Sequence, residues 1–260
     1  MKPVTPDNIE SIPGRKLSET DTFSFACRPE LDCFNRCCRN LNLFLYPYDV
    51  LRLCQNLGIS SGEFIDRYVD VVLRDGNHFP DVLLTMADNE EKTCPFLTKA
   101  GCSVYNDRPY SCRLFPVEQA MVMEDTAGRH GFIYIFRPPE FCHGPGRGDP
   151  MTPGQWIENQ NAERYVRMTM QWAEIKALFV NNPWPGDGAY GPGAKMAFMA
   201  AYNLDAFGDF VFKSGFLKRY RVKKAVQKKL RASRAELLLL GFEWIKLFAW
   251  KIPGPRLRPM

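Results

Sequence analysis

FACRPELDCFNRCCR, which spans residues 25–39, places four cysteines in one short stretch. A second stretch, TCPFLTKAGCSVYNDRPYSCRLFPV (93–117), holds three more, and FCHG (141–144) holds another. The chain has 260 residues, nine of them cysteine, and 45% of its residues are hydrophobic. Because a chain of this length can bury a core without covalent staples, the cysteines need another explanation.

The compartment affects how the cysteines are interpreted. The N-terminal residues lack the apolar run that a signal peptide has. The longest apolar stretch, residues 237–250, is too short for a bilayer span and contains Glu243 and Lys246. We therefore expect a cytoplasmic protein without a transmembrane segment. In the cytoplasm thiols stay reduced, so dense cysteines indicate metal binding or catalysis more often than disulfides.

The nine cysteines divide into two kinds. Cys54 lies on the apolar stripe of a predicted helix, and we interpret it as a small buried hydrophobe. The other eight fall in predicted loops or at loop edges. Soft thiolates suit zinc and iron–sulfur clusters, and eight could fill two four-cysteine sites. The predicted metal ligands are Cys27, Cys33, Cys37, Cys38, Cys94, Cys102, Cys112 and Cys142.

The cysteine spacing favours an iron–sulfur cluster, with zinc as the alternative; for a cluster, we expect the 4Fe–4S type. C-x5-C-x3-C-C is not a zinc-ribbon pair of CxxC units and not a ferredoxin run. A radical-SAM motif would need a cysteine where Asn40 stands. Adjacent side chains in extended chain project to opposite sides, so Cys37 and Cys38 could serve two sites or two irons of one cluster.

Basic residues next to the cysteines are candidate cofactor contacts. Cationic donors near sulfur tune the stability and potential of a thiolate site. Arg108 and Arg113 are the predicted cofactor-binding residues, and Arg36 and Arg39 adjoin other cysteines. The alternative is that these arginines are ordinary surface charges. His143 adjoins Cys142 and is either a substitute ligand or a solvent-facing loop residue.

Periodicity and turn residues predict an α+β fold, predominantly helical, with a small β-hairpin or sheet and irregular cysteine-bearing loops around a metal site. We expect a metal-binding domain over residues 1–150 and a helical C-terminal region over 151–260, packed on it. The predicted elements are helices at 46–58, about 60–72, 155–180, 216–230 and 233–250, strands at 79–86, 119–124 and 131–137, and a surface loop at 138–154.

One segment carries the basic excess of the chain. Residues 213–234 contain ten Lys or Arg and no Asp or Glu, whereas acidic residues outnumber basic ones in the rest of the chain. This distribution does not indicate a nucleic-acid-binding protein. The segment is either a solvated helical face or a contact for an anionic membrane surface, an acidic protein partner or nucleic acid, of which nucleic acid is the least expected.

The three cysteine stretches together resemble the CxxCxxCC cysteine-cluster family, also called YkgJ-like. Residues 93–117 match as C-x-F-L, G-C-x-x-Y and R-P-x-x-C-R-x-F-P, in that order. The family name implies gaps of two residues in the first motif, whereas here the gaps are five and three. The resemblance implies a zinc- or iron-binding domain. A related group, the flagellin lysine N-methylases, has a similar cluster and uses S-adenosylmethionine.

The expected function is therefore a metal-binding protein that holds an iron–sulfur cluster or zinc through cysteine thiolates, with a role in electron transfer or redox chemistry and a protein or redox partner. Two alternatives stay open: an S-adenosylmethionine-dependent protein methyltransferase, and a zinc-stabilised interaction module. GPGRGD (144–149) lacks the strand–turn–helix context of a nucleotide cradle. The residues do not decide whether the protein is an enzyme.

Overall fold

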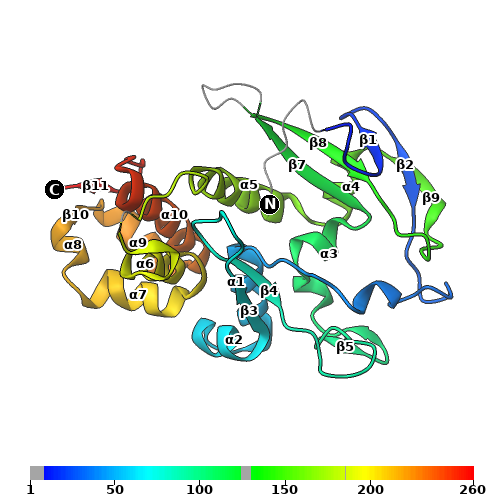
Figure 1. The fold of residues 1–260 in the computed structure, drawn as a ribbon, viewed down its shortest axis with the longest axis horizontal. Coiled ribbons are helices and arrows are strands. Elements are labelled where there is room, and N and C mark those ends of the chain that lie inside the picture. Colours follow the sequence, from blue (N-terminus) through cyan, green and yellow to red (C-terminus); the bar gives the residue numbers. More distant parts are fainter. Residues whose placement is uncertain (1–8, 124–129, 185) are drawn as a thin grey trace. The chain divides into compact units, whose positions relative to one another are not determined.

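The computed structural model describes residues 9–123, 130–184 and 186–260 (Figure 1). The chain divides into two compact units. Unit 1 comprises Met1–Leu41, Met86–Ser103 and Pro109–Ala173, and unit 2 comprises Asn42–Thr85, Val104–Arg108 and Glu174–Met260. Each unit is thus assembled from three separate segments. The functional boundary expected at residue 150 stays a prediction.

The described residues form ten α-helices and short antiparallel strand pairs, which confirms an α+β fold that is mainly helical. The helices are α1 (Pro47–Leu57), α2 (Ser61–Tyr68), α3 (Tyr110–Leu114), α4 (Pro153–Asn159), α5 (Glu163–Leu178), α6 (Pro192–Tyr202), α7 (Leu204–Lys213), α8 (Phe216–Arg219), α9 (Lys224–Ala232) and α10 (Arg234–Trp250). The strands are β1 (Arg15–Leu17), β2 (Phe23–Phe25), β3 (Val69–Val72), β4 (Asp81–Leu84), β5 (Leu97–Thr98), β6 (Gly101–Cys102), β7 (Val117–Met123), β8 (His130–Phe136), β9 (Pro145–Met151), β10 (Tyr220–Arg221) and β11 (Arg258–Pro259).

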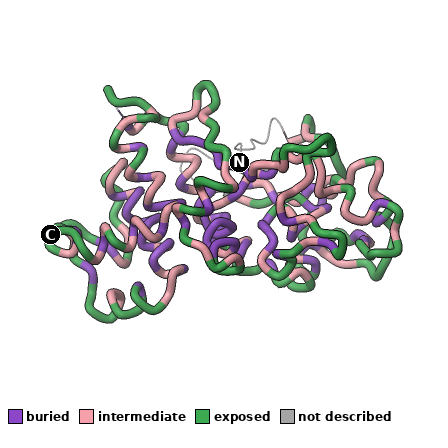
Figure 2. Tube along the Cα trace, turned by 90° about the horizontal axis from the view of Figure 1, so that it is seen from below, coloured by how far each residue is buried: buried purple, intermediate pink, exposed green. Residues whose placement is uncertain are grey.

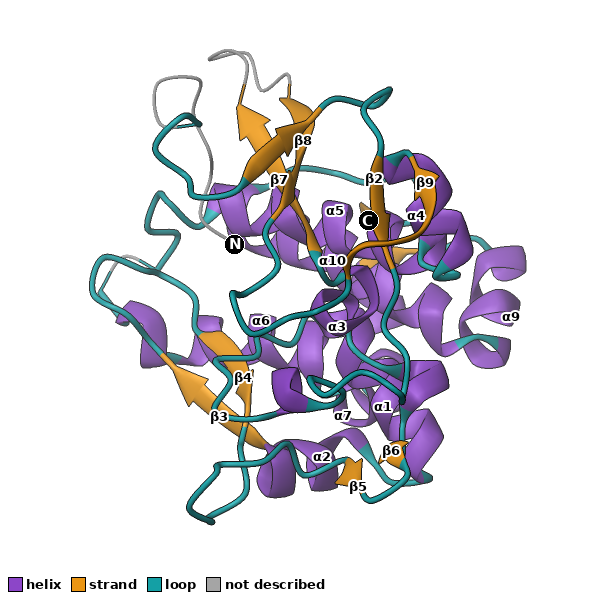
Figure 3. Ribbon diagram, turned by 90° about the vertical axis from the view of Figure 1, so that its right-hand side faces the viewer, coloured by secondary structure: helices purple, strands orange, loops and turns teal. Residues whose placement is uncertain are grey.

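Unit 1 is built on a three-stranded antiparallel sheet of order β1-β8-β7. The hairpin predicted from 119–124 and 131–137 is confirmed as β7 and β8, and its turn lies outside the described residues. A second pair joins β2 to β9 (Figure 3). The indole of Trp156 in α4 packs edge-on against Phe23 and Phe25, so α4 covers β2.

The prediction of a surface loop over 138–154 is wrong for residues 145–151, which form β9. This strand contains two prolines and two glycines, which normally weaken strands. β9 pairs only with β2, so its outer edge needs no further backbone donors. The position just before the strand requires glycine, because a Cβ on Gly144 would lie 2.4 Å from the Phe25 ring. Its carbonyl accepts the Ala26 N–H, which holds the two strands together.

Unit 2 packs helices around α10, whose residues are largely buried. Figure 2 colours the chain by burial and shows buried positions along its coiled segments. The Trp244 side chain of α10 contacts the rings of Phe207 in α7 and Phe216 in α8. Gly241 allows α6 and α10 to pack closely, because a Cβ there would lie 2.4 Å from the carbonyl oxygen of Ala200. The core of unit 2 is therefore formed mainly where α10 meets α6, α7 and α8.

The predicted hairpin of helices at 46–58 and 60–72 is confirmed at its start. Gly58 ends α1 in the left-handed region (φ 66°), and the Ser60 side chain caps α2 by accepting the Glu63 N–H. The second helix nevertheless ends at Tyr68. Val69 and Val72 belong to β3, because a run of β-branched residues fits a strand better than a helix. Val72 is exposed in this strand.

Two other helices are shorter than predicted. The helix expected over 155–180 is divided into α4 and α5, with Asn161 at φ 50° between them. The helix expected over 216–230 is interrupted by β10, which pairs with β11 at the C-terminal end of unit 2. None of the helices in the described ranges combines the length and apolar character that a bilayer crossing would require.

Candidate metal centre

All nine cysteine side chains are free thiols. The eight predicted ligands all fall within the three segments of unit 1, and Cys54 alone falls in unit 2. Cys54 is buried within α1, as predicted for a small hydrophobe. Folding therefore gathers the eight cysteines from stretches more than a hundred residues apart into one compact unit. The prediction that they bind a metal is not tested by their placement alone.

The first two cysteine stretches are joined by backbone hydrogen bonds. Cys37 and Cys38 lie on a 3-10 helix, which Asn35 begins in the left-handed region at φ 63°. The Cys94 N–H donates to the Cys38 carbonyl at 2.8 Å, and the Asn40 N–H donates to the Lys92 carbonyl at 2.9 Å. This short ladder holds the vicinal cysteines beside Cys94.

The next two cysteines lie on short regular elements rather than in open loop. Cys102 is in β6 and pairs with Leu97 in β5, at a tight turn in which Gly101 has φ 115°. Cys112 is on the five-residue helix α3, whose Leu114 carbonyl accepts the indole N–H of Trp156 at 2.9 Å. Both cysteines are half-buried, so each is held by a small structured segment.

The third stretch meets the first at Cys33. The backbone N–H of His143 donates to the Cys33 Sγ at 3.2 Å. The Ala26 N–H donates to the Gly144 carbonyl at 3.2 Å, which brings the third stretch beside Cys27. The His143 amide fixes the position of the Cys33 sulfur, and hydrogen bonds to sulfur are common around thiolate metal sites.

The thiols interact electrostatically as two overlapping groups that share Cys37. Burial, and then the charges of Cys37, Cys142 and Cys33, raise the pKa of Cys27 to about 11. The hydrogen bond with Cys38, followed by burial, raises the pKa of Cys37 strongly. Burial is the main cause of a raised pKa at both Cys94 and Cys142. The charges of Cys102 and Cys37 raise the pKa of Cys94 further. Cys33 and Cys37 do the same for Cys142.

These thiols are chemically suited to zinc or an iron–sulfur cluster. Burial, and then repulsion between the thiolates that would form, disfavour deprotonation, and a metal cation would stabilise the thiolates and displace the protons. Among the described residues, however, no three Cys, His, Asp or Glu side chains already stand at metal-binding spacing. The thiols nevertheless influence one another, because Cys38 raises the pKa of Cys37 and Cys33 contributes, after burial, to the raised pKa of Cys142. The cysteine sulfurs are therefore suitable ligands for zinc or an iron–sulfur cluster, but in the described residues they are not arranged as a complete coordination sphere.

The arginines predicted near the site all have defined contacts. The Arg36 guanidinium lies 5.3 Å from the centre of the Phe141 ring, and Arg39 bonds the Asn35 carbonyl and Glu91. Arg113 is buried, donates to the Gln160 carbonyl and stacks on the Tyr165 ring. In unit 2, Arg108 is buried and stacks on the Tyr105 ring at 4.0 Å. Their role as cofactor contacts stays a prediction.

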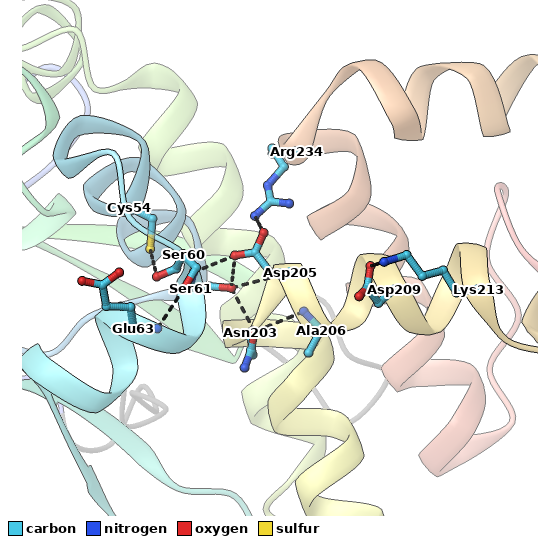
Figure 4. A network of polar contacts seen from close by, with 10 residues as sticks. All are labelled: Cys54, Ser60, Ser61, Glu63, Asn203, Asp205, Ala206, Asp209, Lys213 and Arg234. Carbon is cyan, nitrogen blue, oxygen red and sulfur yellow. Dashed lines mark hydrogen bonds and ion pairs between the residues drawn. The ribbon is translucent and has the colours of Figure 1, made fainter.

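A polar network in unit 2 was not foreseen from the sequence (Figure 4). The Asp205 carboxylate accepts both the backbone N–H and the hydroxyl of Ser61 at 2.7 Å, and it also bonds Arg234. Ser61 also donates to Asn203. Burial, and then the Asp205 charge, raise the pKa of Cys54 to about 12. The network joins the N-termini of α2 and α7 and keeps Cys54 an inert thiol.

Comparison with known proteins supports a metal-binding role for the cysteine segment. Residues 26–129 match the family model CxxCxxCC, described as "Putative zinc- or iron-chelating domain". The match includes every cysteine except Cys142. No curated protein and no solved structure matched the chain. Over residues 26–129, the chain is therefore similar to the CxxCxxCC family, whose description is a zinc- or iron-chelating domain.

Proposed function

We propose that unit 1 binds an iron–sulfur cluster through its cysteine thiolates and serves in electron transfer or redox sensing. The observation that carries the proposal is the gathering of eight free thiols in one unit, with Cys37 common to both interacting groups. Zinc is the alternative that the same sulfur chemistry allows. The CxxCxxCC description covers either metal.

Three features favour a cluster over structural zinc. The cysteine spacing has no pair of CxxC units. The His143 N–H donates to Cys33 Sγ, and hydrogen bonds to sulfur are a principal means of setting cluster potentials. Arg36 and Arg39 flank the vicinal cysteines, where cations would offset the negative charge of a thiolate-bound cluster.

The residues that would hold the cluster are those of the two thiol groups. Cys27, Cys33, Cys37 and Cys142 form the first group, and Cys38, Cys94 and Cys102 extend it through Cys37. A bound cluster would supply one-electron redox chemistry. The chain itself would orient the sulfurs through the Cys94–Cys38 backbone bond and shield Cys33, which is buried.

The test is anaerobic purification of the full chain, followed by its visible spectrum and by iron, zinc and sulfide analysis. A brown protein with iron and acid-labile sulfide in stoichiometric amounts supports the cluster. Cys37→Ser should lose most of the metal, since Cys37 belongs to both groups, whereas Cys54→Ser should retain it. A colourless protein with zinc would refute the cluster while leaving metal chelation intact.

The enzyme alternative is tested on the same sample. Calorimetric titration with S-adenosylmethionine should give no heat of binding if the protein is a metal-binding or electron-transfer module. Binding that depends on the intact metal site would favour the methyltransferase alternative. A reversible midpoint potential in a redox titration would support the redox role.

A further inference from the structure

A strongly basic surface is formed by residues on or next to α8, β10, α9 and β11, in the C-terminal part of the unit 2 sequence. Figure 1 labels the elements that carry these residues. All cations of the surface are exposed. We call it the basic surface, and its residues are Lys218, Arg219, Arg221, Lys223, Lys224, Lys228, Lys229, Arg231 and Arg258. It includes most of the segment 213–234 that carries the charge excess of the chain, together with Arg258 from a distant part of the sequence.

The acidic residues of the helices packed against this surface are already paired. In α7, Asp205 bonds Arg234 and Asp209 bonds Lys213. In α10, Glu236 and Glu243 both bond Arg256. None of the cations of the basic surface has a carboxylate within ion-pair distance among the described residues. The surface therefore presents uncompensated positive charge to the solvent.

The β10–β11 ribbon brings two of these cations together. Arg221 lies directly opposite Arg258 in the antiparallel register, so their side chains project from the same face. Like charges in this arrangement repel each other. The Met260 N–H donates to the Arg219 carbonyl at 3.1 Å, which holds the end of β11 beside α8. An anion bound here would relieve the repulsion between the two arginines.

We propose that the basic surface binds the anionic headgroups of a lipid bilayer. Clusters of Lys and Arg are attracted to acidic lipids by charge alone, and each basic residue raises the binding affinity about five-fold. The side chain of Met260 is 72% exposed, and the backbone of Met260 is held beside Arg219. Aliphatic groups next to a polybasic surface suit the headgroup boundary of a bilayer.

Nucleic acid is the less suitable partner. Proteins that bind single strands combine basic residues with exposed aromatic rings on which bases stack. The strongly exposed aromatic side chains among the described residues are Tyr105, Phe132 and Tyr190, and none belongs to the basic surface. Tyr220, between Arg219 and Arg221, is half-buried with its ring 4.8 Å from that of Phe216. A lipid surface needs charge without stacking platforms, which is what this surface offers.

The experiment is co-sedimentation of the full chain with phosphatidylcholine vesicles that contain either no acidic lipid or about 30% phosphatidylserine, at about 0.1 M salt. The wild-type chain should bind only the acidic vesicles, and higher salt should release it. The triple variant Lys218→Gln, Arg221→Gln, Lys224→Gln should bind them about a hundred-fold more weakly. These side chains are exposed, so the variant should keep the wild-type circular dichroism spectrum and unfolding midpoint.

The matched control is Arg67→Gln, Arg167→Gln, Lys195→Gln, which removes the same charge from exposed positions outside the surface. It should bind acidic vesicles within a few-fold of the wild type. Equal loss in both variants would show that only net charge matters and would overturn the proposal. Failure to bind acidic vesicles would overturn it too, as would tighter binding to duplex DNA or single-stranded RNA at the same salt. Binding is measured with and without bound metal, so its outcome is independent of the cluster.

Discussion

Asp205→Ala removes the acceptor at the centre of the unit 2 network. Ser61 is buried, and its backbone N–H and hydroxyl both donate to this carboxylate at 2.7 Å. Hydrogen bonds to a charged group contribute about 1.5–3 kcal/mol each, but Asp205 itself is only half-buried, so we expect the lower part of that range. The exposed pair with Arg234 adds less than about 1 kcal/mol. Two hydrogen bonds at about 1.5 kcal/mol each, together with the ion pair, give an expected total loss of about 3–4 kcal/mol.

Asp209→Ala is the matched control on the same helix. Asp209 is exposed and bonds only the exposed Lys213 in the described structure, so its removal should cost less than about 0.5 kcal/mol. The assay is urea unfolding followed by circular dichroism, with a Ser61→Ala, Asp205→Ala double-mutant cycle to isolate the coupling. If Asp205→Ala costs no more than Asp209→Ala, or if the cycle shows no coupling, the proposed role of the network is wrong.

The same network gives a pH dependence. Burial alone would raise the pKa of Asp205, but the hydrogen bonds from Ser61 and Arg234 outweigh it and hold the pKa below its ordinary value. A carboxyl with a lowered folded pKa stabilises the fold fully above its unfolded pKa of about 3.9 and loses that contribution as the pH falls through the folded value. The difference in unfolding free energy between wild type and Asp205→Asn should therefore shrink below about pH 4.

Further variants test the close packing beside the cysteines and the division of the thiols. Gly144→Ala should destabilise the protein by about 1–3 kcal/mol in thermal unfolding, because its Cβ would lie 2.4 Å from the Phe25 ring. Gly154→Ala, whose Cβ would meet only the Thr152 Oγ1 at an ordinary contact distance of 3.8 Å, should be neutral or slightly stabilising, and equal effects would contradict the packing argument. Cys54 should resist iodoacetamide in the native, metal-free protein at pH 7, because a pKa of about 12 leaves about one thiolate in 10⁵. Mass spectrometry that finds Cys54 alkylated as fast as the exposed Cys27 would refute its assignment as an inert thiol.

Local sequence signals were sufficient where the neighbours along the chain decide the structure. The apolar stripe and Gly58 place α1 and its end, and Ser60 places the start of α2. Such signals failed where distant segments decide. Residues 145–151 carry the prolines and glycines of a loop but form β9, because β2 supplies a partner strand. Asn161 divides one periodic helix into two by adopting a left-handed conformation that periodicity cannot reveal.

By itself, the sequence determined the kind of chemistry available: abundant cysteines without a disulfide framework, a matching cysteine-cluster domain and a local excess of positive charge. These follow from residue types and spacing, which need no coordinates. Only the tertiary structure decided which thiols meet, that Cys37 is shared by two groups, and that Cys54 belongs to the other unit. The reason is that contacts such as the His143 N–H on Cys33 join residues far apart in the chain, and their formation depends on how the whole unit packs.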